Sequence, residues 1–359
     1  MTTTLRIPPD WDAVTPEWMT FALASSHPKV EVSRIELLLR DDGTNRRARF
    51  GLDYRVGSGP STVFVKAADP AHAELNAATG GALNEARFFQ EDVALPVDHP
   101  QVHVALIDEA RLDFFLVMED VVARGGDPRD STRPLTVEQA TNGVRALARL
   151  HSTFWGDRLT RKAALSWIEP FVAWRGMARG IDIGLARAGD TIPAAVRKLT
   201  GRVIEGDLWT RFVSTLSEGP LTLLHGDAHI GNTYVLPDDE IGFLDWQVLR
   251  RGNYSIDLGY FLQGALPIEL RRAEEEAIVA EYQRALDLPD DERPMLDEVW
   301  LRYRASVAHG LALWLATAAS DTWQRPEVSM ALAQRYSAAF VDLDTAGAID
   351  ELTQRESGT

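Results

Sequence analysis

The chain has 359 residues, of which 45% are hydrophobic and 25% are charged, and its formal net charge is −16. This composition is typical of one large or two medium globular domains and argues against disordered and fibrous classes. The acidic excess argues against an extended surface for nucleic-acid phosphates. The chain contains no cysteine, which excludes disulfides, cysteine-ligated zinc and cysteine nucleophiles.

We expect neither a secretion signal nor a membrane span. The N-terminal stretch MTTTLRIPPDWDAV lacks the basic and apolar regions of a signal peptide. No run of about 18 apolar residues occurs along the chain. These features predict a cytoplasmic protein with no membrane partner.

The first third of the sequence predicts a sheet. Apolar residues alternate with a period of two in several short segments, and DFFLVME is a continuous apolar run typical of a buried strand. A helix is expected in the second half of 71–92, where apolar residues recur at helical spacing. The predicted strands cover residues 32–40, 48–56, 61–69, 102–108 and 113–119.

The pattern changes after Val121. ARGGDPRDSTRP reads as a loop, and the next 20 residues show helical spacing with Thr136 as the expected N-cap. TYVLP and IGFLDW predict a hairpin joined by residues 238–240. Further helices are expected near 195–216, 267–286 and 296–318. We predict an α+β fold with an N-terminal lobe at 1–121 and a mostly helical C-terminal lobe at 122–359.

The stretch LLHGDAHIGNTYV places several polar side chains between two apolar runs. Transfer of a phosphoryl group needs a carboxylate near the attacking hydroxyl, oxygen ligands for Mg²⁺ and a lysine for the phosphates. Asp227 and Asn232 have the interval of the protein-kinase catalytic loop. Asp245 ends the hairpin, Lys66 ends the third predicted strand, and Glu85 lies in the following helix.

Taken together and in this order, these motifs resemble the aminoglycoside phosphotransferase and choline kinase family, small-molecule kinases with a protein-kinase-like bilobal fold. The family's loop pattern stands here as HGDAHIGN and its metal motif as LDW at 244–246. Asp257-Leu258 and LARLHSTFWG match two further family segments. LVMEDV and FWG resemble the ecdysteroid-kinase-like branch. The resemblance covers residues 32–263.

The resemblance implies an ATP- and Mg²⁺-dependent transfer of the γ-phosphate to a hydroxyl of an aminoglycoside-, choline- or steroid-like molecule. Asp227 is then the catalytic carboxylate, and Asn232 and Asp245 bind the metal. Lys66 contacts the α- and β-phosphates and pairs with Glu85, although Glu74 competes for that role.

The resemblance also implies a nucleotide pocket. The Glu119 carbonyl and the Val121 N–H group are expected to bond the adenine, which Met118 lines. Thr44 and Asn45 are candidates for the phosphate turn, because the sequence there lacks the glycine-rich pattern of protein kinases. Neighbouring arginines at 46, 47 and 49 either steer phosphate or form an exposed basic strand.

Two alternatives of other classes remain open. One is a metallohydrolase that uses His225, Asp227 and His229, because H-x-D-x-H can chelate a metal. The other is a pseudokinase that binds nucleotide without turnover. In the kinase interpretation His225 and Asp257 brace the loop instead of reacting. The acceptor is expected near Asp227, and four aromatic residues are candidates to line its site: Trp167, Phe171, Trp174 and Trp314.

Overall fold

The computed structural model describes residues 5–40, 43, 45–72, 81–91 and 93–357. The chain divides into two compact units. The N-terminal unit comprises residues 1–94, 99–127 and 245–248, and the C-terminal unit comprises 95–98, 128–244 and 249–359. The lobe boundary expected after residue 121 stays a prediction. Within the described ranges, no helix is both long and apolar enough to cross a membrane.

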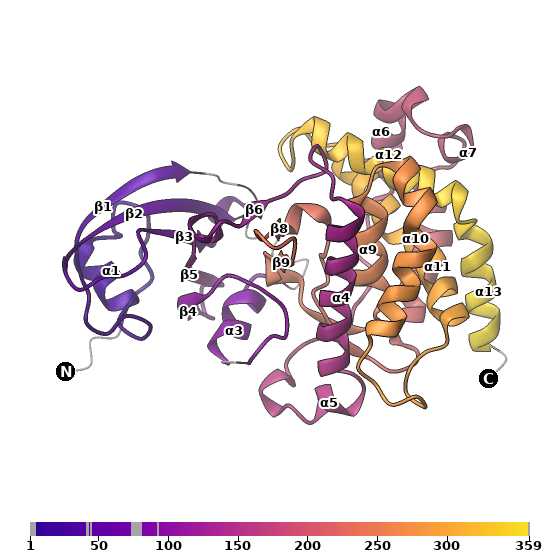
Figure 1. Ribbon diagram of the computed structural model, residues 1–359. Coiled ribbons are helices and arrows are strands. Elements are labelled where there is room, and N and C mark those ends of the chain that lie inside the picture. Colours follow the sequence, from indigo (N-terminus) through magenta and orange to yellow (C-terminus); the bar gives the residue numbers. More distant parts are fainter. Residues whose placement is uncertain (1–4, 41–42, 44, 73–80, 92, 358–359) are drawn as a thin grey trace. The chain divides into compact units, whose positions relative to one another are not determined.

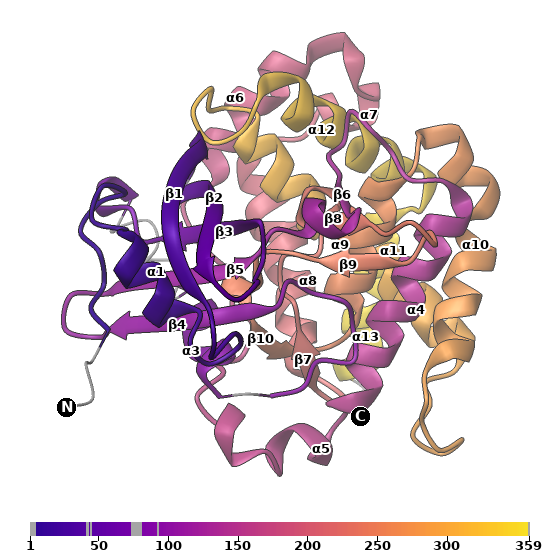
Figure 2. The ribbon, with the colours of Figure 1, turned by 60° about the vertical axis from the view of Figure 1, so that its left-hand side comes forward.

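The N-terminal unit contains the expected five-stranded antiparallel sheet, with the strand order β1-β2-β3-β5-β4 (Figures 1 and 2). All five strands lie where the sequence predicts them, to within a few residues at each end. Their bounds are β1 Glu31–Arg40, β2 Arg46–Val56, β3 Thr62–Ala67, β4 Val102–Asp108 and β5 Asp113–Glu119.

Both faces of this sheet are covered, which explains the continuous apolar run in β5. Phe115 and Val117 pack into one core with the N-terminal segment, and Leu116 and Met118 pack into a second core with the helix α3. Successive side chains of a strand point to opposite faces. Lys66 of β3 pairs in register with Leu116, so its side chain lies on the face covered by α3.

Two helices in the described part of the N-terminal unit flank the sheet. α3 spans Asn84–Gln90 and carries Glu85 in its first turn. α1 spans Pro16–Ala22 and is not among the elements that we predict from the sequence. Its start has a recognisable signal, because the Thr15 side chain accepts a hydrogen bond from the Trp18 N–H group and proline occupies the first helical turn.

The C-terminal unit is mostly helical (Figure 1). Its central helix α11 packs most extensively against α6, α9, α12 and α13, and it also contacts α8 and α10. Thr136 caps α4 in a capping box with Gln139, which confirms the expected N-cap. The bounds are α4 Val137–Thr153, α5 Asp157–Thr160, α6 Ala178–Ala188, α7 Ala194–Arg197, α8 Arg211–Ser214, α9 Ser255–Ala265, α10 Ile268–Ala285, α11 Leu296–Thr317, α12 Pro326–Asp342 and α13 Thr345–Ser357.

The helical stretch expected near 195–216 is present, but it is interrupted. α7 ends at Arg197, and a π-helix occupies Val203–Thr210 before α8 begins. The break covers residues 198–200, and the helix resumes at Gly201, whose N–H group donates to Asp182 at 2.6 Å. A side chain there would lie 1.9 Å from the Ala178 carbonyl oxygen. This close approach to α6 is a tertiary contact and leaves no periodic signal in the sequence.

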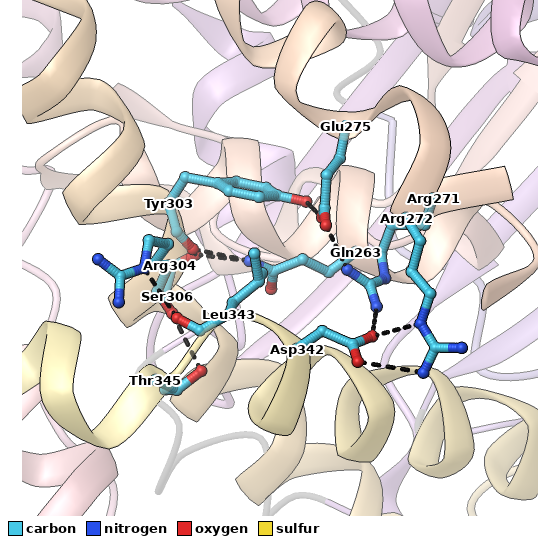
Figure 3. A network of polar contacts seen from close by, with 10 residues as sticks. All are labelled: Gln263, Arg271, Arg272, Glu275, Tyr303, Arg304, Ser306, Asp342, Leu343 and Thr345. Atoms are coloured by element: carbon cyan, nitrogen blue, oxygen red, sulfur yellow. Dashed lines mark hydrogen bonds and ion pairs between the residues drawn. The ribbon is translucent and has the colours of Figure 1, made fainter. Parts of the chain in front are cut away.

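A buried polar network joins the helices α9 to α12 (Figure 3). Arg271 is fully buried and contacts Glu275 at 2.5 Å as well as Asp342. Tyr303 donates to Glu275 at 2.8 Å. Burial raises the pKa of Glu275, and Arg271 opposes this shift. The network pairs the buried charge of Arg271 with two carboxylates, as a buried ion requires.

Candidate functional site

The polar loop 225–232 is framed by short strands of the C-terminal unit. β7 (Thr222–Leu224) leads into the loop and pairs with β10 (Arg250–Gly252). β8 (Thr233–Val235) and β9 (Ile241–Phe243) follow as the expected antiparallel hairpin. A further short strand, β6 (Asp127–Pro128), lies where the chain passes between the units. Regular pairing on both sides therefore holds the two ends of the loop.

Asp257 of α9 braces the start of the loop. Its two carboxylate oxygens accept the N–H groups of His225 at 2.7 Å and Gly226 at 2.9 Å. Gly226 has a φ of +82°, a backbone conformation that residues other than glycine rarely adopt. His151 lies 3.3 Å from the same carboxylate and is itself bonded to Tyr282. Asp257 thus holds the backbone, as the sequence led us to expect.

His225 links the loop to the end of the hairpin. Its Nε2 lies 2.9 Å from the Leu244 carbonyl oxygen, and its Nδ1 accepts from the Asp227 N–H group at 3.2 Å. A carbonyl oxygen cannot donate, so the ring proton is on Nε2. Leu244 in turn donates its N–H group to the Asn232 carbonyl at 2.8 Å. The loop therefore fixes the residue that precedes Asp245.

Asp227 and Asn232 are brought together. The Nδ2 atom of Asn232 lies 2.9 Å from both the backbone oxygen and Oδ2 of Asp227. An amide nitrogen donates and the amide oxygen accepts, so the oxygen of Asn232 is the atom available to a cation. The side chain of Asp227 is one-quarter exposed. The role of Asp227 as the catalytic carboxylate stays a prediction, and so does the role of Asn232 as a metal ligand.

The N-terminal unit contains a buried ionic cluster on the α3 face of the sheet. Lys66 Nζ lies 2.6 Å from Glu85 Oε2 and 2.7 Å from Asp245 Oδ1. Burial opposes the charge of Lys66, but Asp245 and Glu85 outweigh it and raise the lysine pKa. The expected contact between Lys66 and Glu85 is therefore present. Glu74, the competing partner, lies outside the described residues.

The backbone around Asp245 is held in an uncommon conformation. Asp245 has a φ of +60°, in the left-handed region that aspartate tolerates better than most residues. The next N–H group, of Trp246, donates to Glu85 Oε1 at 3.1 Å. The Trp246 ring stacks on Phe88 with centroids 6.3 Å apart. Glu85 thus positions both the lysine and the backbone beside the expected metal ligand.

The segment expected to bind adenine follows β5. Met118 and Val121 are buried, and Val121 begins a 3₁₀ turn that ends at Arg124. The first N–H groups of a helical turn have no partner within it. The Asp120 carboxylate accepts a hydrogen bond from the second of these groups, the Val122 N–H group, at 3.2 Å. The Val121 N–H group is therefore suited to a ligand, and its contact with adenine, like that of the Glu119 carbonyl, stays a prediction.

Asp120 is a structural residue of this segment that we do not predict from the sequence. It is buried, accepts the Thr62 hydroxyl at 2.8 Å and forms an ion pair with Arg49. Arg49 of β2 therefore has a structural partner in the residue that follows β5. An aspartate directly before a helical turn is an N-cap signal, and that signal is present here in MEDV.

The expected phosphate turn is described in part. Thr44 lies outside the described residues. Asn45 is buried, and its Nδ2 donates to Gln247 Oε1 at 2.8 Å. Gln247 lies two residues after Asp245, so this bond connects the turn to the segment of the expected metal ligand within the N-terminal unit. A phosphate contact of Asn45 stays a prediction.

The metallohydrolase alternative does not fit the loop. Both ring nitrogens of His225 are bonded within the protein. The Nδ1 of His229 accepts the Gly231 N–H group at 3.0 Å. Neither side chain offers the lone pair that a metal needs. Over the described part of the chain, no three His, Asp or Glu side chains converge in a set that could hold a metal ion.

The solved structures that this chain resembles include kinases of choline, ethanolamine and aminopropanol. A choline kinase, LicA from Streptococcus pneumoniae, is 14% identical with a TM-score of 0.47, over 91% of this chain and 98% of that one. An ethanolamine kinase from Plasmodium vivax is 11% identical with a TM-score of 0.49, over 85% and 81%. A microcompartment-associated aminopropanol kinase is 20% identical with a TM-score of 0.47, over 92% and 98%.

The sequence of the chain shows its family. A search of curated protein sequences finds no match. The family model for the phosphotransferase enzyme family (APH) matches residues 51–297. That range covers more than half of the chain and includes Lys66, Glu85, Asp227, Asn232 and Asp245. The chain therefore belongs to the phosphotransferase enzyme family, whose members are small-molecule kinases with a protein-kinase-like fold.

Proposed function

We propose that this enzyme transfers the γ-phosphate of ATP to a hydroxyl group of a small molecule, with Mg²⁺ as the metal. The observation that carries this proposal is the construction of the Asp227 loop. Asp257 and His225 hold its backbone, and Asn232 holds the carboxylate at 2.9 Å. A carboxylate that is oriented and partly exposed can position an attacking hydroxyl group and accept its proton.

The reaction exchanges one phosphorus–oxygen bond for another. The acceptor oxygen forms a bond to the γ-phosphorus while the bond from that phosphorus to the β–γ bridging oxygen breaks, and ADP leaves. The hydroxyl proton passes to Asp227 and from there to solvent. Asp227 orients the hydroxyl and takes its proton, and little other covalent chemistry is asked of the protein.

The oxygen donors of Asn232 and Asp245 fit Mg²⁺, which prefers hard oxygen ligands. Asn232 turns its amide nitrogen to Asp227, which leaves the oxygen end for the ion. The Asp245 carboxylate is one-quarter exposed. The bound ion would neutralise charge on the β- and γ-phosphates.

Lys66 supplies the positive charge for the α- and β-phosphates in this proposal. Glu85 holds its ammonium group, and the raised pKa keeps it charged at neutral pH. Met118, the Glu119 carbonyl and the Val121 N–H group receive the adenine. Thr44 and Asn45 contribute to the phosphate turn.

The acceptor is proposed to be an aminoglycoside-, choline- or steroid-like alcohol. The family membership supports the reaction class, and a fold does not choose among acceptors. Trp314 and Phe171 are buried aromatic residues of the C-terminal unit, and Trp314 packs on the His229 ring at 5.0 Å. That contact supports an apolar wall near the Asp227 loop.

The experiment that tests this proposal measures ADP release from MgATP with a panel of amino alcohols, aminoglycosides, sugars and sterols. One acceptor should raise ADP release by at least roughly tenfold over the rate with water. Mass spectrometry should then show the acceptor heavier by one phosphate. A protein that binds MgATP but is stimulated by no acceptor would favour the pseudokinase alternative. Absence of nucleotide binding would contradict the proposal.

A further inference from the structure

His229 lies next to Asp227 in the loop and has no role in the proposed chemistry so far. We infer that His229 is a positioning residue, whose Nε2–H group holds the Asp227 carboxylate in its reactive orientation. This inference rests on the proposed function. It adds a second donor to the one that Asn232 provides.

The proton position on His229 follows from its neighbours. Nδ1 accepts the Gly231 N–H group at 3.0 Å, so Nδ1 carries the lone pair and Nε2 carries the proton. Nε2 lies 3.8 Å from Oδ2 of Asp227. This distance is too long for a hydrogen bond but short enough for attraction to a carboxylate. Contacts of this kind tighten when substrate binds.

The ring of His229 has little freedom to turn away. Trp314 packs against it at 5.0 Å and 83°, and Tyr260 packs at 5.6 Å and 69°. We call these two residues the aromatic clamp. Both are buried, so the ring sits between edge-to-face contacts of the preferred geometry. The Nε2–H direction is therefore set before any substrate arrives.

Gly231 is part of the same arrangement. A Cβ at this position would lie 2.6 Å from Cε1 and 2.9 Å from Nδ1 of His229. Any side chain there must push the imidazole out of place. The glycine thus provides both the N–H group that fixes the tautomer and the space that the ring occupies.

His229 affects the reaction through the orientation of the Asp227 carboxylate. Asn232 donates to Oδ2 from one direction at 2.9 Å, and His229 faces the same oxygen. When the His229 N–H group closes onto Oδ2 beside that of Asn232, the carboxylate is turned so that Oδ1 faces the hydroxyl. Loss of the His229 donor should let the carboxylate rotate, which lowers turnover without changing nucleotide affinity.

The first test reads the tautomer and needs no substrate. The ring nitrogens of ¹⁵N-histidine-labelled protein are recorded by NMR at neutral pH. The signals that are absent from the spectrum of His229→Gln are those of His229. We expect a neutral ring with the proton on Nε2. A proton on Nδ1, or on both nitrogens, would overturn the inference, whether or not the protein turns over ATP.

The second test measures hydrolysis of MgATP with water as acceptor, together with MgADP affinity. His229→Phe keeps the ring and removes the donor, so kcat should fall roughly tenfold with the KM for ATP unchanged. His229→Gln, which can place an amide N–H group near the same position, should recover most of the rate. Gly231→Ala should behave like His229→Phe because it displaces the ring.

The matched control is His72→Gln. His72 also pairs with a carboxylate, that of Asp69 at 2.8 Å, but lies in the N-terminal unit. It should leave kcat unchanged. Equal rates for the wild type and His229→Phe would overturn the inference, and so would a raised KM for ATP at unchanged kcat. A wild type without any turnover would count against the proposed function, and the tautomer would still decide the inference.

Discussion

Lys66 and Asp245 lie against each other in the N-terminal unit, with Nζ 2.7 Å from Oδ1. In the proposed reaction the two residues have different partners, because Lys66 contacts phosphates and Asp245 contacts Mg²⁺. Binding of MgATP should therefore exchange the contact between them. The contact of Lys66 with Glu85 at 2.6 Å can persist, and Glu85 keeps the lysine in place during that exchange.

Removal of the Lys66 ammonium group should destabilise the nucleotide-free protein. Lys66→Met leaves Glu85, which is 4% exposed, as a buried carboxylate without its cation. Loss of one partner from a buried pair costs about 3–5 kcal/mol. Glu85→Gln should cost less, because Asp245 still balances the lysine. Thermal unfolding followed by circular dichroism compares the two variants, and equal melting temperatures for Lys66→Met and the wild type would contradict the predicted cost.

Replacement of Asp245 should affect the metal-dependent part of nucleotide binding. Asp245→Asn removes the charge expected at Mg²⁺, so affinity for MgATP should fall roughly tenfold or more. Affinity in EDTA should stay close to the wild-type value, since no metal contact is made there. Isothermal titration calorimetry with and without Mg²⁺ measures both. If the variant bound MgATP as tightly as the wild type, Asp245 would not be a metal ligand.

Asp257 should control turnover through the loop backbone. Asp257→Asn replaces one acceptor oxygen by an NH₂ group, which cannot accept from both His225 and Gly226. We expect a loss of stability of about 1–3 kcal/mol and a lower kcat. Asp182→Asn serves as control, because Asp182 also accepts a backbone N–H group, that of Gly201, outside this loop. Equal effects of the two variants on kcat would contradict a specific role for Asp257.

His309 should make the C-terminal unit sensitive to acid. Burial lowers the pKa of His309 to about 3, while Asp257 raises it and His229 lowers it further. A histidine in the unfolded chain titrates near 6.5, so below that pH the unfolded state binds the extra proton. The contribution of neutral His309 to the free energy of unfolding should therefore be fully present above about pH 6.5. Below that pH, the free energy of unfolding should fall by about 1.4 kcal/mol per pH unit.

The measurement is the melting temperature between pH 7.5 and 5. His309→Gln should be less stable at pH 7.5, because it weakens the bond from the Trp209 indole to His309 at 3.2 Å. Its melting temperature should nevertheless fall less steeply with acid than that of the wild type. Parallel curves for the two proteins would show that His309 is not the group that titrates.

The sequence predicts the residues that lie in regular elements. Lys66 follows from the period of two in VFVK, and Glu85 from the helical spacing around it, because period determines which face a side chain occupies. The hairpin follows from its two short apolar runs, whereas Asp257 is identified from the resemblance to the kinase family.

Features created by tertiary contact are not predicted. The bond from His225 to Leu244 and the ion pair of Asp120 with Arg49 join residues far apart in the chain. The helix that resumes at Gly201 lies too close to α6 for a side chain at that position. No periodicity records such contacts, and the Asp120 N-cap signal consists of a single residue. The packing of Trp314 on His229 likewise depends on how α11 folds back onto the loop.

The most direct test of the central claim compares the wild type with Asp227→Asn at saturating MgATP and acceptor. The variant keeps the size of the side chain and lacks the carboxylate charge, so it cannot take the hydroxyl proton. We predict that kcat falls by roughly 10²–10⁴-fold while the dissociation constant for MgADP changes by less than about threefold. A variant that turns over at the wild-type rate would contradict the role of Asp227 and with it the proposed mechanism.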